Sequence, residues 1–144
     1  MLVKSRAAVL VSLIFALALP TVTLAQTSPA QAPQSPLFSE IQAKIARTIG
    51  AAPLTVEIIQ TGSIITVLRI NSNMNDATHS GRDNEASAIA PIVANAVTDR
   101  SEFKNLTTIR VQYVVQSAPG TTSKVIDTVD FRKSPSGTFE FHKT

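Results

Sequence analysis

The polar segment Ser72–Glu85 (SNMNDATHSGRDNE) holds the densest group of side chains capable of chemistry in this sequence. The members that could contact a ligand are Asp76, His79, Arg82 and Asp83. A histidine beside carboxylates can bind a metal or transfer a proton, so one hypothesis places a functional site here. The segment is also long for an unstructured connection, and long loops are often functional.

Two metal-binding patterns are incomplete in this segment. The spacing of its histidine matches neither HxH, HxxxH nor HExxH, so the sequence predicts no histidine metal site. Asn71, Asn73 and Asn75 alternate as calcium ligands do, but the turn glycine is missing and Arg82 stands at the twelfth position. We therefore expect no bound metal, and an asparagine-rich turn explains the pattern.

Asp127 has an unusual place in its own segment. It shares the alternation of Val125, Val129 and Phe131, which an antiparallel strand would turn toward the core. A carboxylate there is costly unless it is paired, so Asp127 is either an acid in a pocket or part of a strand end, edge or bulge. Asp130 lies three positions away and should point to the opposite face, so the two cannot share an acid–base site.

Basic residues cluster near the end of the sequence: Arg132, Lys133, His142 and Lys143. If the last two segments form an antiparallel pair, these side chains form a small basic patch. Such a patch binds anionic lipid headgroups or polymers. The alternative is a solvated sheet edge whose charges discourage strand pairing.

Other reaction classes lack the residues that they require. The chain has no cysteine, which excludes disulfides, thiolate metal sites and a cysteine nucleophile. There is no GxSxG motif, and the glycines are too isolated to form a phosphate loop. We therefore predict no catalytic residue and no cofactor, and a non-enzymatic protein.

The net charge does not indicate a nucleic-acid partner. Of 13 basic residues, Lys4 and Arg6 belong to a segment that we expect to be removed, which leaves 11 basic against 10 acidic residues. The uncharged run Ala7–Leu19 and Pro20 follow, an arrangement typical of a secretory signal peptide cleaved after Ala25. The protein is then periplasmic or extracellular. Residues 26–36 are rich in proline and glutamine and should form a tether or a simple spacer.

The remaining elements follow from hydrophobic periodicity. Ser35 and Pro36 are typical of a helix start, Phe38 to Ile49 carry one apolar face, and Gly50 ends the helix. Strands 55–59 and 63–71 flank a turn at Thr61-Gly62 and predict a hairpin. A second helix covers Ile89 to Arg100. It begins near Ala90, or it includes earlier turns of the polar segment and a kink at Pro91.

Three further strands are expected at 106–116, 124–133 and 138–142, separated by proline- and glycine-containing turns. In the first of them, Ile109, Val111, Tyr113 and Val115 should face the core. The sequence thus predicts one α+β domain over 37–144, in the order α-β-β-α-β-β. Its antiparallel sheet of four to five strands should carry both helices on one face.

Three stretches within about residues 38–115 carry a resemblance to a known family: Leu54–Val67 (LTVEIIQTGSIITV), Arg82–Ala90 and Ile109–Tyr113 (IRVQY). Together with the order of elements, they resemble the BON domain of exported bacterial proteins. Arg69 stands near the family's second glycine, no Gly-Val pair precedes the third strand, and two further strands follow. The resemblance implies a non-enzymatic envelope module that contacts phospholipid or a partner protein, and transfers no site residue.

Three functions are consistent with these patterns. The first is a small exported binding module whose partner is an envelope protein or an anionic membrane surface, with no nucleic acid involved. The second is a secreted enzyme or inhibitor that acts through the 72–85 segment. The third is a structural protein that assembles through an open sheet edge.

Overall fold

A computed structural model describes residues 35–118 and 121–142, and the expected signal peptide lies outside these ranges. The helices are α1 (Pro36–Ile49) and α2 (His79–Val97), with short 3-10 helices η1 (Pro53–Thr55), η2 (Asn73–Asp76) and η3 (Ser101–Phe103). The strands are β1 (Val56–Thr61), β2 (Ile64–Ile70), β3 (Thr108–Val115), β4 (Lys124–Lys133) and β5 (Phe139–His142).

Helix α1 begins and ends where its sequence signals place it. Ser35 is the N-cap residue, and Pro36 occupies the first turn, where a missing N–H costs no hydrogen bond. Gly50 ends the helix in the left-handed conformation (φ 65°), and the Ala51 N–H bonds the Ala46 carbonyl at 2.8 Å. The predicted apolar face packs on the sheet, with Ile41 and Ile45 buried.

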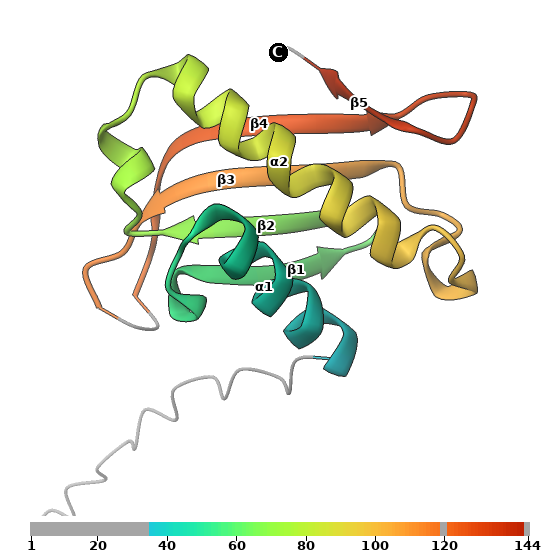
Figure 1. Ribbon diagram of the computed structural model, residues 1–144, viewed down its shortest axis with the longest axis horizontal. Helices are drawn as coiled ribbons and strands as arrows, with labels where there is room; N and C mark the ends of the chain where they lie inside the picture. The colour runs from blue at the N-terminus through green and yellow to red at the C-terminus, as the bar shows by residue number, and fades with distance from the viewer. Residues whose placement is uncertain (1–34, 119–120, 143–144) are drawn as a thin grey trace, which may run out of the picture.

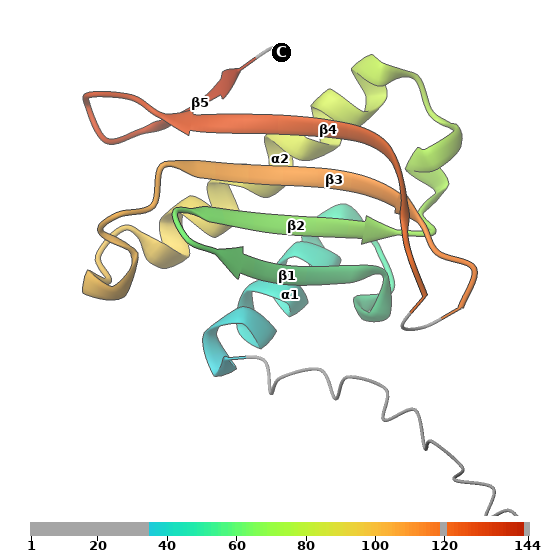
Figure 2. The ribbon, with the colours of Figure 1, turned by 180° about the vertical axis from the view of Figure 1, so that it is seen from behind.

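The five strands form one sheet in the order β1-β2-β3-β4-β5, with both helices on one face (Figure 1; Figure 2, from behind). The α+β class and the one-sided helix layer are thus confirmed, with the element order α-β-β-α-β-β-β. The sheet is mostly antiparallel, as expected, but β2 and β3 are parallel. The reason is α2, which crosses the sheet between them and returns the chain to the same end.

The core lies between the helices and the inner face of the sheet. Alternate residues of each strand enter it, including Ile65 and Val67 of β2 and Ile109 and Val111 of β3, all with no exposed surface. We call the other side of the sheet the open face, because no helix covers it in Figure 2.

The expected 14-residue loop at Ser72–Glu85 is mostly helical. After η2, α2 begins at His79, and the Thr78 hydroxyl accepts the Gly81 N–H at 3.2 Å as an N-cap. Pro91 lies inside the helix, so of our two alternatives the earlier start is the correct one. The polar composition was misleading because these turns are held by ion pairs to the sheet.

A register shift between Tyr113 and Val114 corrects two predicted core positions. Tyr113 pairs with Asp127, but Val114 pairs with Val125, so Ile126 is an extra residue on β4. As a result, Val115 and Val125 are 40% and 49% exposed rather than inward, and Val114 is buried in place of its neighbour.

Candidate functional site

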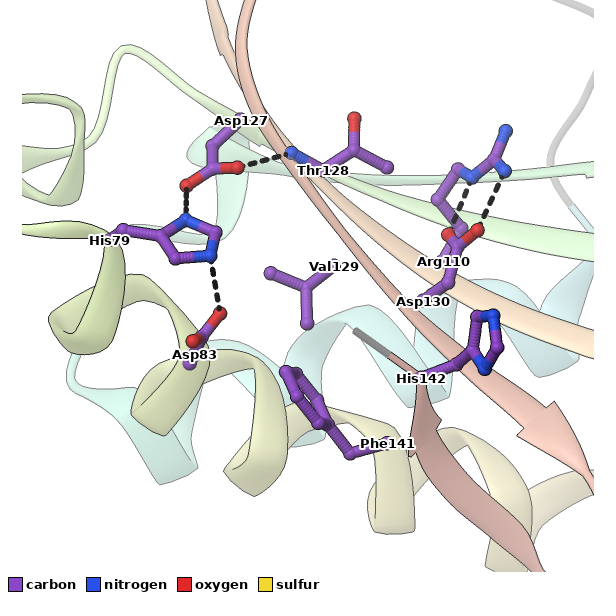
Figure 3. Close-up of a pocket in the computed structure, with 9 residues that line it drawn as sticks. All are labelled: His79, Asp83, Arg110, Asp127, Thr128, Val129, Asp130, Phe141 and His142. Carbon is purple, nitrogen blue, oxygen red and sulfur yellow. Dashed lines mark hydrogen bonds and ion pairs between the residues drawn. The ribbon is translucent and has the colours of Figure 1, made fainter. Parts of the chain in front are cut away.

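A pocket of about 410 Å³ lies at the edge of the sheet, where β5 ends beside β4 and the first turns of α2 (Figure 3). We call it the edge pocket. Its lining comes from four elements: His79 and Asp83 of α2, residues 127–130 of β4, Phe141 and His142 of β5, and Arg110 of β3. Three of the four residues that we singled out in Ser72–Glu85 lie at or beside this pocket, together with Asp127.

The pocket exists because β5 covers only part of β4. Strand β5 pairs with residues Asp130–Lys133, so the outer edge of β4 before Asp130 has no strand partner among the described residues. The Lys133 N–H donates to Thr107 beside β3. Because N–H groups alternate along a strand, the Thr128 N–H points outward, away from β3.

The Asp127 side chain accepts the hydrogen bond of this outward-pointing N–H. Its Oδ1 accepts the Thr128 N–H at 2.8 Å, while its Oδ2 accepts hydrogen bonds from Arg82 Nε and from His79 Nδ1, each at 2.6 Å. Burial raises the pKa of Asp127, but the hydrogen bonds from Arg82, His79 and Thr128 outweigh it, and the pKa is lowered. Asp127 therefore lies at a sheet edge beside a bulge, the second of our two alternatives. It also lines the edge pocket, but as a paired carboxylate with a lowered pKa and not as the pocket acid of the first alternative.

Arg82 fixes the start of α2 against the sheet. Its Nη1 donates to the carbonyls of Met74 at 3.2 Å and Ala77 at 2.6 Å, so it satisfies the backbone between η2 and the helix. The Arg82 carbonyl in turn accepts the Tyr113 hydroxyl at 2.9 Å, and burial raises the pKa of that hydroxyl. These bonds hold the pocket wall in one position relative to β3 and β4.

His79 lies between two carboxylates, as Figure 3 shows. Its Nδ1 contacts Asp127, and its Nε2 is 3.7 Å from Asp83 Oδ1. That Asp83 oxygen is buried and accepts no hydrogen bond from the described residues, whereas the His79 side chain above it is 54% exposed. Movement of the imidazole would uncover a carboxylate oxygen that has unused capacity to accept a hydrogen bond.

The opposite wall holds a second ion pair. Arg110 donates to Asp130 through Nε at 2.7 Å and Nη2 at 2.8 Å, a two-point contact on the open face. These hydrogen bonds lower the pKa of Asp130, although burial acts in the opposite direction. Val129 and Phe141 supply the apolar surface between the two polar walls.

The predicted basic patch is divided between the two faces of the last hairpin. Arg132 pairs with Glu140, and His142 pairs with Asp130, so each basic group on the open face has a carboxylate opposite it. Lys133 pairs with Phe139 and points to the other face. Lys143 lies outside the described residues. Asp76, the remaining predicted contact, lies in η2 and does not line the edge pocket.

One buried ion pair escaped the sequence analysis. Arg69, 2% exposed, faces the helices, where its Nε donates to Glu85 at 2.8 Å and its Nη1 to the Thr55 carbonyl at 3.1 Å. A signal was available, because Arg69 has the same alternation as Ile65 and Val67. This pair links α2 to β2 and lies apart from the edge pocket.

The His79–Asp127 pair could act as a proton acceptor, but its free nitrogen faces a carboxylate rather than a nucleophile. Within 35–118 and 121–142, no group of three or more acidic or histidine side chains is placed to hold a metal ion. No helix in the same ranges is long and apolar enough to cross a membrane. Comparison with family models, curated proteins and solved structures finds no match.

Proposed function

We propose that this protein is a small exported binding module of the cell envelope, without a catalytic role, and that it binds a partner protein at the edge pocket. The observation that carries the proposal lies within the described residues: the edge of β4 before Asp130 has no strand partner there, and beside it is a pocket with an apolar surface and a carboxylate oxygen that accepts no hydrogen bond from them. Seven of the nine lining residues are polar or charged, so the pocket offers fixed hydrogen-bonding groups around the apolar surface of Val129 and Phe141.

The geometry favours a protein partner over an anionic membrane. Binding to anionic lipid requires cations without competing carboxylates, at about 1 kcal/mol for each one near the surface. Arg132 and His142 instead lie opposite Glu140 and Asp130, and Lys133 faces the other way. The resemblance to BON domains is consistent with an envelope module of either kind.

The enzyme alternative has one supporting observation, the contact between His79 and Asp127 in a pocket. Two observations count against it. Asp127 is already shared among His79, Arg82 and the Thr128 N–H, and Nε2 of His79 points to Asp83. A general base needs a free nitrogen within reach of a substrate proton.

Photo-crosslinking in the cells that make the protein tests the proposal. Phe141 lines the pocket and is 44% exposed, so a benzoylphenylalanine there keeps the aromatic ring at the surface. We expect a protein adduct that is lost on Asp83→Asn. The matched control is the same probe at Gln60, an exposed position on β1. Lipid adducts, or equal adducts at both positions, would overturn the proposal.

A further inference from the structure

We infer that a second copy of this chain packs on the open face of the sheet, so that two copies form a weak symmetric dimer through this face. The inference goes beyond the proposed function, which concerns the edge pocket. Its supports are a continuous group of apolar side chains on the open face, the balance of the charges beside them, and the area that two such faces bury.

Strand β2 is apolar on both of its faces. Ile65 and Val67 enter the core, while the residues on either side of them point to the open face. A strand with water on one face usually alternates apolar with polar residues, as β3 does with Arg110 and Gln112 on that face. We call the apolar side chains of the open face the apolar strip: Ile59, Ile64, Leu68, Ile70, Val114 and Val125.

The apolar strip extends over four strands. Along β2 it holds every residue of the open face except Thr66, and Ile59 of β1 lies beside that position. At the end of β2, one row joins Ile70, Val114 and Val125, which pair across β2, β3 and β4. Ile59 is 41% and Val125 49% exposed, and no helix of the described residues covers this face (Figure 2). A contiguous exposed apolar patch of this kind marks an interaction surface.

The charged groups beside the apolar strip are balanced within the chain. Arg110 forms a two-point ion pair with Asp130, and Arg132 lies opposite Glu140. A strongly charged partner would have to separate such pairs, which leaves a charge without compensation. A second copy has an apolar strip and the same balanced pairs, so it fits this face without separating them. In a twofold dimer, each copy contributes the same surface.

The area of the open face is sufficient for a weak dimer. Five strands about 4.8 Å apart and seven residues along β2 give a face of about 24 by 23 Å. Two faces that overlap fully therefore bury about 1,100 Å² together, near the lower limit for specific interfaces. We expect reversible association, with the two sheets about 10 Å apart and their side chains interdigitated.

Sedimentation of the full chain, purified from the cells that make it, measures this association from about 10 µM to about 1 mM, where weak complexes dissociate. The dimer fraction should rise over this range. Ile59→Lys should weaken the dimer at least about tenfold, because both copies bring an ammonium group into the interface. Ile59 lies on β1, at the opposite edge of the sheet from the edge pocket. The matched control is Leu54→Lys, which places the same charge at a 90% exposed leucine before β1.

Methyl chemical shifts locate the surface that associates. With rising concentration, the methyl groups of Leu68 and Ile70 should shift, while those of Ile41, buried beneath α1, should not. A monomer at every concentration, or a dimer that Ile59→Lys leaves intact, would overturn the inference. So would Leu68 methyl shifts that change on deletion of residues 26–34 but not with concentration, because the N-terminal segment would then be the occupant of the apolar strip.

Discussion

The two outer edges of the sheet are protected by different kinds of interaction. At β1, the N-terminal turns of α1 extend past the strand, and α1 is held by apolar contacts such as those of Ile41 and Ile45 (Figure 1). At β4, the cover consists of the short β5, the overhanging turns of α2 and the hydrogen bonds of Asp127. The apolar cover does not depend on ionisation, whereas the polar cover does.

This difference separates a structural edge from one that can bind. Exposed strand edges are sites of unwanted pairing, and proteins protect them with helices, short strands or charges. An apolar helix layer opens only when part of the core is disrupted. A network centred on one carboxylate can be displaced locally by a competing group, which is why we place binding at β4 rather than β1.

The largest expected effect comes from loosening the β1 cover. Ile45 is fully buried under α1, and Ile45→Ala should reduce the free energy of unfolding by about 3 kcal/mol through lost burial and a cavity. Urea denaturation measures this loss. Leu54→Ala is the control, since Leu54 is 90% exposed and should change stability little. A loss below about 1 kcal/mol would mean that α1 is not an apolar cover.

A smaller reduction in the free energy of unfolding is expected when the polar cover of the β4 edge is removed. Asp127→Ala leaves Arg82 and the Thr128 N–H without a shared acceptor and should cost about 2 kcal/mol. The variant should also associate more readily, as light scattering at high concentration would show, because its edge is open to single strands of unfolded chains. Asp99→Ala serves as the matched control. Unchanged stability and a monomeric state would refute the role assigned to Asp127.

Low pH should destabilise the β4 edge before it destabilises the β1 edge. The folded pKa of Asp127 is lowered, so its stabilisation is present above the unfolded value, about 3.9, and is lost as pH falls through the folded value. Asp130 follows the same direction. We therefore expect hydrogen-exchange protection of the Thr128 amide to fall in acid before that of the β1 amides. If the amides of both edges lost their hydrogen-exchange protection at the same pH, the proposed difference between the two edges would be wrong.

The smallest effect is expected from substitutions in the predicted basic patch, measured as binding to anionic liposomes. Because carboxylates lie opposite Arg132 and His142, flotation with anionic liposomes should be weak and nearly independent of salt. Replacing both Arg132 and Lys133 with glutamate should change it little. Strong flotation that high salt abolishes would restore the membrane alternative.

Local patterns were sufficient to predict most elements but not the site. The capping signals of α1, the turn at Gly62 and the alternation along β3 as far as Tyr113 act within a few residues, and each is confirmed. The contact between His79 and Asp127 joins residues 48 positions apart and depends on where α2 starts. Ion pairs to the sheet determine that start, so hydrophobic periodicity could not reveal it.

The same limitation explains two other differences. The side-chain directions near Val115 and Val125 depend on a register shift, which no sequence signal marked. The parallel pairing of β2 and β3 depends on the path of α2 across the sheet, which is a property of the whole domain.

That parallel pairing also has a kinetic consequence. The hairpin β1–β2 needs only a two-residue turn, whereas β2 meets β3 through partners such as Ile65 and Ile109, with all of α2 between them. Closing such a long loop costs chain entropy before any contact compensates for it. We expect the joining of β2 to β3 to limit the folding rate, so Val111→Ala should slow folding more than Ile58→Ala.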